Sequence, residues 1–152
     1  LESVKTLDLT IDGADEIDTN LNLIKGGGGA HYREKMLTKA SSYFLCIADD
    51  SKKVNALGRF GIPVEINAKR LDHVKHELLK YFPEFSQRDT LSDNGNVLAD
   101  LRGKILEEPI KFEKIVNDIE GVVEVGIFAV DRPNLAIIGL ESSYELMESS
   151  MA

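Results

Sequence analysis

Four consecutive glycines at positions 26–29 restrict the fold of this 152-residue chain more than any other feature of its sequence. They lie between a short apolar segment, residues 21–24, and a run of good helix formers, residues 30–40. Each ordered glycine costs about 0.5–1 kcal/mol relative to alanine, which a plain strand-to-helix connection does not require. Unshielded N–H groups leading into a helix N-terminus predict a site for an anion or a developing oxyanion, with Lys25 adding a mobile positive charge. A flexible linker is the alternative interpretation.

A cluster of carboxylates lies just before the glycines. Residues 7–12 alternate apolar and polar side chains, as a half-buried strand does, and Asp12, Asp15 and Glu16 stand at its carboxyl end. Three carboxylates this close repel one another unless a cation, hydrogen-bond donors or a polyol occupies them. An N-cap with a solvated acidic turn explains the same residues, so spacing alone leaves both interpretations open.

Two further charged residues are candidates for the same site. Glu34 falls in the first turns of the helix after the glycines, where a carboxylate could reach back over the loop as a general base. The apolar run 43–48 predicts a strand buried on both faces, followed by a helix over residues 52–57. Lys52 is thereby placed at the edge of the sheet where α/β proteins bind ligands. The alternatives are a Glu that interacts with the helix dipole and a solvated lysine.

The middle of the chain has a different organisation. Residues 64–130 predict the order β-α-β-β-α-β, with the hairpin turn marked by Asn-Gly at 94–95, as in a ferredoxin-like split βαβ unit. We therefore expect an α/β part at residues 1–60, an α+β insert at residues 61–130, and a return strand with a tail at residues 131–152. Ligands often bind at such junctions.

Composition excludes several classes of protein. The chain has 18 Lys and Arg against 26 Asp and Glu, a formal charge of −8, and no basic patch for nucleic acid. No apolar run approaches the roughly 20 residues that cross a bilayer, so no membrane partner is expected. The single cysteine, Cys46, cannot form an internal disulfide and indicates a reducing, cytoplasmic compartment, with its thiol in the core. His73 and His76 lack a third ligand for a metal, and residues 141–152 predict a polar tail.

Several segments together resemble the signatures of one enzyme family, ribose-5-phosphate isomerase type A. The two long ones are the acidic stretch at 12–16 and the glycine loop with the start of its helix, residues 25–35. Shorter ones lie at 48–53, 57–60, 92–96, 119–123 and 125–128. The resemblance extends over essentially the whole chain.

The resemblance implies an aldose-ketose isomerase that interconverts ribose 5-phosphate and ribulose 5-phosphate in the non-oxidative pentose phosphate pathway, without metal or organic cofactor. Glu34 would move a proton between C2 and C1 through a cis-enediol(ate). Asp12 would assist ring opening, and Lys25 with the glycine amides would stabilise the enediolate oxygen. The implied substrate-binding residues are Asp12, Gly13, Ala14, Asp15, Lys25, Gly26, Gly27, Gly28 and Lys52.

The same resemblance implies a Rossmann-like three-layer domain with an inserted ferredoxin-like lid, assembled as a homodimer or homotetramer. The family also has a preceding stretch with a Gly/Ser/Thr-rich loop for the substrate phosphate, which these 152 residues lack. We therefore expect an N-terminally truncated Rossmann-like part. A non-catalytic sugar-phosphate sensor of the same general fold and a ferredoxin-like scaffolding module remain the alternatives.

Overall fold

A computed structural model describes residues 5–148, so the expectations for residues 1–4 and 149–152 lie outside the described residues. The protein is a mixed α/β structure with three sheets. In chain order its elements are β1 (Thr10–Asp12), β2 (Glu16–Ile17), β3 (Leu23–Ile24), α1 (His31–Ala40), β4 (Phe44–Asp49), η1 (Asp50–Lys52), β5 (Ile62–Ile66), η2 (Ala68–Arg70), α2 (Leu71–Leu78), β6 (Glu84–Leu91), β7 (Val97–Arg102), α3 (Pro109–Asn117), β8 (Val122–Val125), β9 (Ile127–Phe128), β10 (Leu135–Gly139) and β11 (Tyr144–Glu148).

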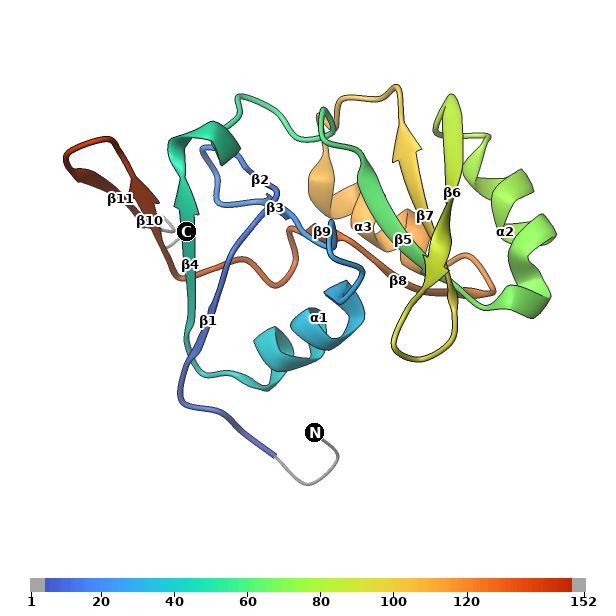
Figure 1. The fold of residues 1–152 in the computed structure, drawn as a ribbon, viewed down its shortest axis with the longest axis horizontal. Helices are drawn as coiled ribbons and strands as arrows, with labels where there is room; N and C mark the ends of the chain where they lie inside the picture. Colours follow the sequence, from blue (N-terminus) through green and yellow to red (C-terminus); the bar gives the residue numbers. More distant parts are fainter. Residues whose placement is uncertain (1–4, 149–152) are drawn as a thin grey trace.

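The first sheet has the strand order β1-β4-β10-β11 and carries the acidic turn at one end (Figure 1). β1, β4 and β10 are parallel, and β11 returns antiparallel to β10. Parallel neighbours bring their carboxyl ends to one edge, so Asp12 at the end of β1 lies near the end of β4. Cys46 is fully buried in β4, and burial raises the pKa of its thiol to about 11. The expectation of a core cysteine is confirmed.

A small antiparallel sheet, β2-β3-β9, lies between the two larger sheets (Figure 1). Its neighbouring residues point to opposite faces, as in any strand. Leu23 and Phe128 enter the core of the first sheet, whereas Ile24 and Ile127 enter the core of the other large sheet. These two short strands therefore belong to both cores.

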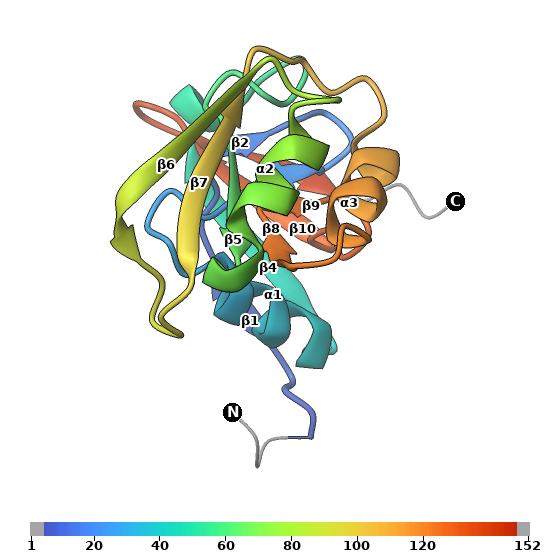
Figure 2. The same cartoon turned by 90° about the vertical axis from the view of Figure 1, so that its right-hand side faces the viewer.

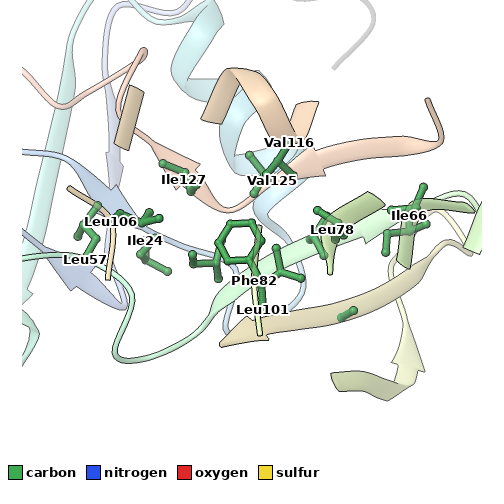
Figure 3. Close-up of a cluster of buried hydrophobic side chains, with 14 of the residues drawn as sticks. Ile24, Leu57, Ile66, Leu78, Phe82, Leu101, Leu106, Val116, Val125 and Ile127 are labelled. Carbon is green, nitrogen blue, oxygen red and sulfur yellow. The ribbon is translucent and has the colours of Figure 1, made fainter. Parts of the chain in front are cut away.

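The second sheet, β6-β7-β5-β8, is antiparallel throughout and has α2 and α3 packed beside it (Figure 2). Figure 3 shows the apolar side chains of these elements gathered in one core, with Leu78 and Phe82 from the α2 region facing Leu101 and Val125. The predicted order β-α-β-β-α-β is confirmed. The Asn-Gly hairpin is confirmed as well, because Gly95 has a positive φ of 77° between β6 and β7.

The helix predicted over residues 52–57 is wrong. Asp49 caps a short helix as expected by accepting the Ser51 N–H at 2.9 Å, but η1 ends at Lys52. The Lys53 N–H still bonds to Asp50 O at 3.1 Å, but the N–H of Val54 donates to the carbonyl of Ile17 at 2.8 Å. Long-range pairing therefore uses the backbone groups that a longer helix would need.

The polar tail predicted for residues 141–152 is also wrong over part of its length. β11 forms five residue pairs with β10, from Gly139↔Tyr144 to Leu135↔Glu148. The side chains of Tyr144 and Leu146 remain exposed, so this strand is held mainly by its backbone ladder. None of the helices between residues 5 and 148 combines the length and apolar character needed to span a membrane.

Candidate functional site

A cavity of about 260 Å³ opens where β1 and β4 end and the glycine loop begins. The catalytic and substrate-binding residues implied by the sequence all lie around this one cavity, although they come from four separate parts of the chain. They are Asp12, Gly13, Ala14, Asp15, Lys25, Gly26, Gly27, Gly28, Glu34 and Lys52. The structure therefore brings the acidic turn, the glycine loop, the first turn of α1 and η1 to a common surface.

Lys25 is the central charge of this cavity. Its side chain is only 3% exposed, and its Nζ lies 3.0 Å from Asp12 Oδ2 and 3.5 Å from Glu34 Oε2. The same nitrogen donates a 2.5 Å hydrogen bond to the carbonyl of Gly13. The backbone N–H of Lys25 bonds to Gly126 O at 2.9 Å, which continues the β3–β9 pairing and fixes where the side chain starts. Lys25 is thus a fixed cation between two carboxylates.

Glu34 has the electrostatics of a group that can accept a proton from a ligand. Burial is the main cause that raises the pKa of its carboxyl, Lys25 lowers that pKa, and the negative charge of Asp12 raises it again. Its Oε2 atom has no hydrogen-bond partner among residues 5–148, although Lys25 lies 3.5 Å away. A carboxylate with a raised pKa and an unused lone pair can accept a proton from a ligand.

Close contacts at Gly26 and Gly27 leave no room for side chains and order this part of the glycine loop. Gly26 has a φ of +105°, and a Cβ there would lie 2.6 Å from Nδ1 of the buried His31. At Gly27 a Cβ would lie 2.8 Å from the Asp15 carboxylate and 2.9 Å from the ring of Phe60. The flexible-linker interpretation therefore does not fit these glycines.

The acidic cluster divides into two roles, which corrects the expectation that all three carboxylates meet. Asp12 and Asp15 line the cavity, and Asp15 accepts the Gly27 N–H at 2.7 Å. Glu16 is buried and points away, accepting the N–H groups of Gly58 and Phe60 at 2.6 Å each. Glu16 therefore holds the segment after η1 in place and does not belong to the cavity.

One contributor to the site was not foreseen from the sequence. Arg88 on β6 donates from one terminal nitrogen to the carbonyls of Gly26 and Gly27, each at 3.1 Å. Its other nitrogens donate to Asp100 on β7 at 2.8 and 2.7 Å. Opposite charges on the two strands of the predicted hairpin were the available signal, but nothing in the sequence connected that hairpin to the glycine loop.

Metal chemistry has no visible support in the part of the chain that is described. Residues 5–148 contain no group of three or more His, Cys, Asp or Glu side chains placed to hold a metal ion. His73 and His76 both lie on α2, which packs beside the second sheet and not at the cavity.

Together these features define an α/β protein with an acid–base site at the carboxyl ends of parallel strands, built from a lysine between two carboxylates and a glycine loop. Comparison with known proteins identifies a family to which such a protein belongs. The family model for ribose 5-phosphate isomerase A (phosphoriboisomerase A) matches residues 1–143. The chain belongs to this family.

Individual relatives agree with the family match. Ribose-5-phosphate isomerase A of Buchnera aphidicola subsp. Baizongia pistaciae is 37% identical over 149 residues, covering 97% of this chain and 68% of the relative. The crystal structure of ribose 5 phosphate isomerase A from Neisseria gonorrhoeae matches with a TM-score of 0.95 at 39% identity, covering 99% of this chain and 68% of that one.

A third relative was solved with a ligand. It is a D-ribose-5-phosphate isomerase in complex with phospho-erythronic acid, with a TM-score of 0.90 and 32% identity, covering 97% of this chain and 68% of that one. Across the curated relatives the chain spans 64–68% of their length.

Proposed function

We propose that this chain interconverts D-ribose 5-phosphate and D-ribulose 5-phosphate through a cis-enediol(ate), as a step of the non-oxidative pentose phosphate pathway. One observation carries the proposal: Glu34, with a raised pKa and an oxygen that has no hydrogen bond within residues 5–148, lies 3.5 Å from the buried cation of Lys25 in a cavity lined by Asp12 and Asp15. The names of the relatives support the same reaction.

Glu34 is the base in this proposal. Its carboxylate removes the proton from C2 of the open-chain aldose, and the C1 oxygen gains the negative charge of an enediolate. The protonated Glu34 then delivers the proton to C1, while the hydroxyl proton on O2 moves to O1. No atom is gained or lost, so the reaction needs no external oxidant or reductant.

Lys25 and the glycine loop stabilise the charge that appears on the enediolate oxygen. The Lys25 ammonium is already fixed by Asp12 and Gly13, so little reorganisation accompanies the reaction. The backbone N–H groups of Gly26 and Gly28 supply further donors, each typically worth about 2.7–4 kcal/mol in an oxyanion site, while the Gly27 N–H orients Asp15. Phospho-erythronic acid, the ligand of one solved relative, carries a carboxylate on a sugar phosphate and suits such a site.

The remaining residues bind the substrate. Asp12, one third exposed and paired with Lys25, exchanges protons with the sugar oxygens during ring opening. Asp15 holds sugar hydroxyls together with Gly13 and Ala14, and Lys52 contacts the substrate from η1.

We further propose that the chain divides into two parts. Residues 1–60 and 131–152 form a Rossmann-like part, supported by the parallel β1, β4 and β10 strands. Residues 61–130 form a ferredoxin-like lid, supported by the strand order β6-β7-β5-β8 and its two helices. The family resemblance supports a cytoplasmic homodimer or homotetramer, and no bound cofactor enters the proposed steps.

The test is the rate of conversion of ribose 5-phosphate to ribulose 5-phosphate by the chain and by its Glu34→Gln variant. We expect a loss of about 10²–10⁴-fold in kcat, because the amide cannot accept the proton. Glu84→Gln, an exposed position on β6, is the matched control and keeps the rate.

The binding of ribose 5-phosphate, measured by calorimetry on the same proteins, separates the alternatives. Binding without turnover that is unaffected by Glu34→Gln would indicate a sugar-phosphate sensor. A folded chain that neither binds nor converts the sugar would contradict the proposed function.

A further inference from the structure

Arg88 connects the second sheet to the glycine loop through four hydrogen bonds of its guanidinium. One terminal nitrogen donates to Gly26 O and Gly27 O, and the other nitrogens form a two-point bond with the Asp100 carboxylate. The side chains of Arg88 and Asp100 are 18% and 14% exposed. A planar guanidinium held at two points has a defined direction, which a lysine ammonium cannot reproduce.

Fixing a carbonyl also fixes the next N–H group. The peptide unit is planar and trans, so its C=O and N–H bonds point in opposite directions. When Arg88 holds the carbonyls of Gly26 and Gly27, the N–H groups of Gly27 and Gly28 must point to the opposite side. The Gly27 N–H confirms this direction, because it donates to Asp15, which lines the cavity.

The loop needs such a restraint. Glycine has the widest range of backbone conformations, and a Cβ built at Gly28 would meet no atom within 4 Å. Side-chain packing therefore does not hold Gly28. Two contacts hold the backbone there: the Gly29 N–H donates to Gly26 O at 2.9 Å, and Arg88 donates to the carbonyl of Gly27, which fixes the peptide unit between Gly27 and Gly28.

We infer that Arg88, anchored by Asp100, is a positioning residue that aims the Gly28 N–H toward the cavity where charge develops and keeps the Gly27 N–H on the Asp15 carboxylate that lines it. The inference rests on the proposed function for its kinetic consequence and on the geometry alone for its effect on the loop. Arg88 does not itself line the cavity, so it acts through the loop and not by touching the substrate.

The experiment compares Arg88→Lys and Asp100→Asn with the unmodified chain. By NMR, exchange of the Gly27, Gly28 and Gly29 amide protons should be at least about tenfold faster in both variants, while core amides keep their protection. In the isomerase assay kcat should fall about 10–100-fold, while KM stays within about threefold of its original value. N–H donors displaced by a fraction of an ångström stabilise the transition state less well but change the binding of the substrate little.

Arg70→Lys is the matched control. Arg70 is half exposed and pairs with Glu120 on the surface, so its variant should leave both the glycine amides and kcat unchanged. If Arg88→Lys does not fold, as judged by circular dichroism and the thermal midpoint, Asp100→Asn decides, because it keeps the arginine and removes only its anchor.

The outcomes separate the two proposals. Unchanged glycine exchange in the folded Arg88 and Asp100 variants overturns the positioning role, whether or not the chain is active. A chain without any turnover refutes the proposed function, and the exchange rates alone then decide the role of Arg88. Turnover with an unchanged kcat in both variants overturns the kinetic part of the inference.

Discussion

Two buried lysines lie close to the ring of Phe128 and have different surroundings. The Nζ atoms of Lys25 and Lys35 are 5.6 and 4.4 Å from the centre of its ring. Lys35 donates to Glu113 at 2.7 Å and to two backbone carbonyls, and it pairs with Glu124 at 3.2 Å. Lys25 instead faces a cavity and two carboxylates that remain partly exposed.

The difference lies in how fully the partners are satisfied. Glu113 uses its second oxygen to accept the N–H groups of Ala129 and Val130, at 2.8 Å each, so the Lys35 cluster has little capacity left. Glu34, the partner of Lys25, keeps an oxygen without a hydrogen bond among the described residues. A buried lysine whose partners are saturated stabilises the fold, whereas one whose partners retain a lone pair is available for chemistry.

The first prediction concerns Lys35→Met and has the largest expected effect on stability. The variant leaves Glu113 and Glu124 without their cation in the interior, which should lower the free energy of unfolding by about 3–5 kcal/mol. Urea unfolding followed by circular dichroism measures this loss. Lys39→Met is the control, since Lys39 is on the same helix, lies 4.0 Å from Glu124 and is exposed, so little change is expected. Equal losses of unfolding free energy in both variants would contradict a stabilising role of the buried Lys35 ion pairs.

The second prediction concerns Lys25→Met, for which rate and stability should separate. Loss of the central cation should lower kcat/KM about 10²–10³-fold, by analogy with the removal of one oxyanion donor. The free energy of unfolding should fall by only about 1–2 kcal/mol, because Asp12 and Glu34 are partly solvated and only the Gly13 carbonyl loses its donor. A stability loss as large as that of Lys35→Met would remove the distinction between the two lysines.

The third prediction is a pair of pH shifts, smaller than either loss. Glu34 must be ionised to act as a base, and burial raises its pKa, so activity should fall on the acid side at a pH above the 4.5 of an ordinary glutamate. Asp12→Asn removes a negative neighbour that raises this pKa, so the acid limb should move to lower pH. Lys25→Met removes a cation that lowers the Glu34 pKa, so the acid limb of the pH–activity profile should move to higher pH.

The measurement is the pH dependence of kcat for the unmodified chain, Asp12→Asn and Lys25→Met. Asp93→Asn is the control. Asp93 pairs with Arg33, which lies on α1 next to Glu34, but Asp93 is not among the groups that shift the Glu34 pKa. Shifts of the same sign in both variants would contradict the assigned electrostatics.

Local chemistry explains why part of the molecule was predictable. The glycine run, the strand before it and the helix after it are encoded within a few residues, so the sequence alone places Glu34 and Lys25 near one another. Glu16 could not be separated from Asp12 and Asp15, because its partners, the N–H groups of Gly58 and Phe60, lie more than forty residues away. Arg88 was missed for the same reason, since its contact with the loop depends on the placement of one sheet against another.

The two lysines illustrate the limit most clearly. Lys25 and Lys35 are ten residues apart, and each lies next to two apolar residues, at positions 23–24 and 36–37. Only the carboxylates that reach Lys35 from α3 and β8 identify it as structural. The strand β11 was missed because its sequence does not separate a buried apolar face from an exposed polar one. Its apolar side chains Tyr144 and Leu146 are exposed.

The sharing of β3 and β9 between both cores has a consequence for the order in which the protein matures during synthesis. The backbone of Lys25 is tied to Gly126, and Leu23 is paired with Phe128, so the proposed catalytic lysine is anchored by residues made about a hundred positions later. The ribosome must therefore release most of the chain before the cavity can close around Lys25. A nascent chain that stops before β9 has every proposed catalytic residue and no assembled site.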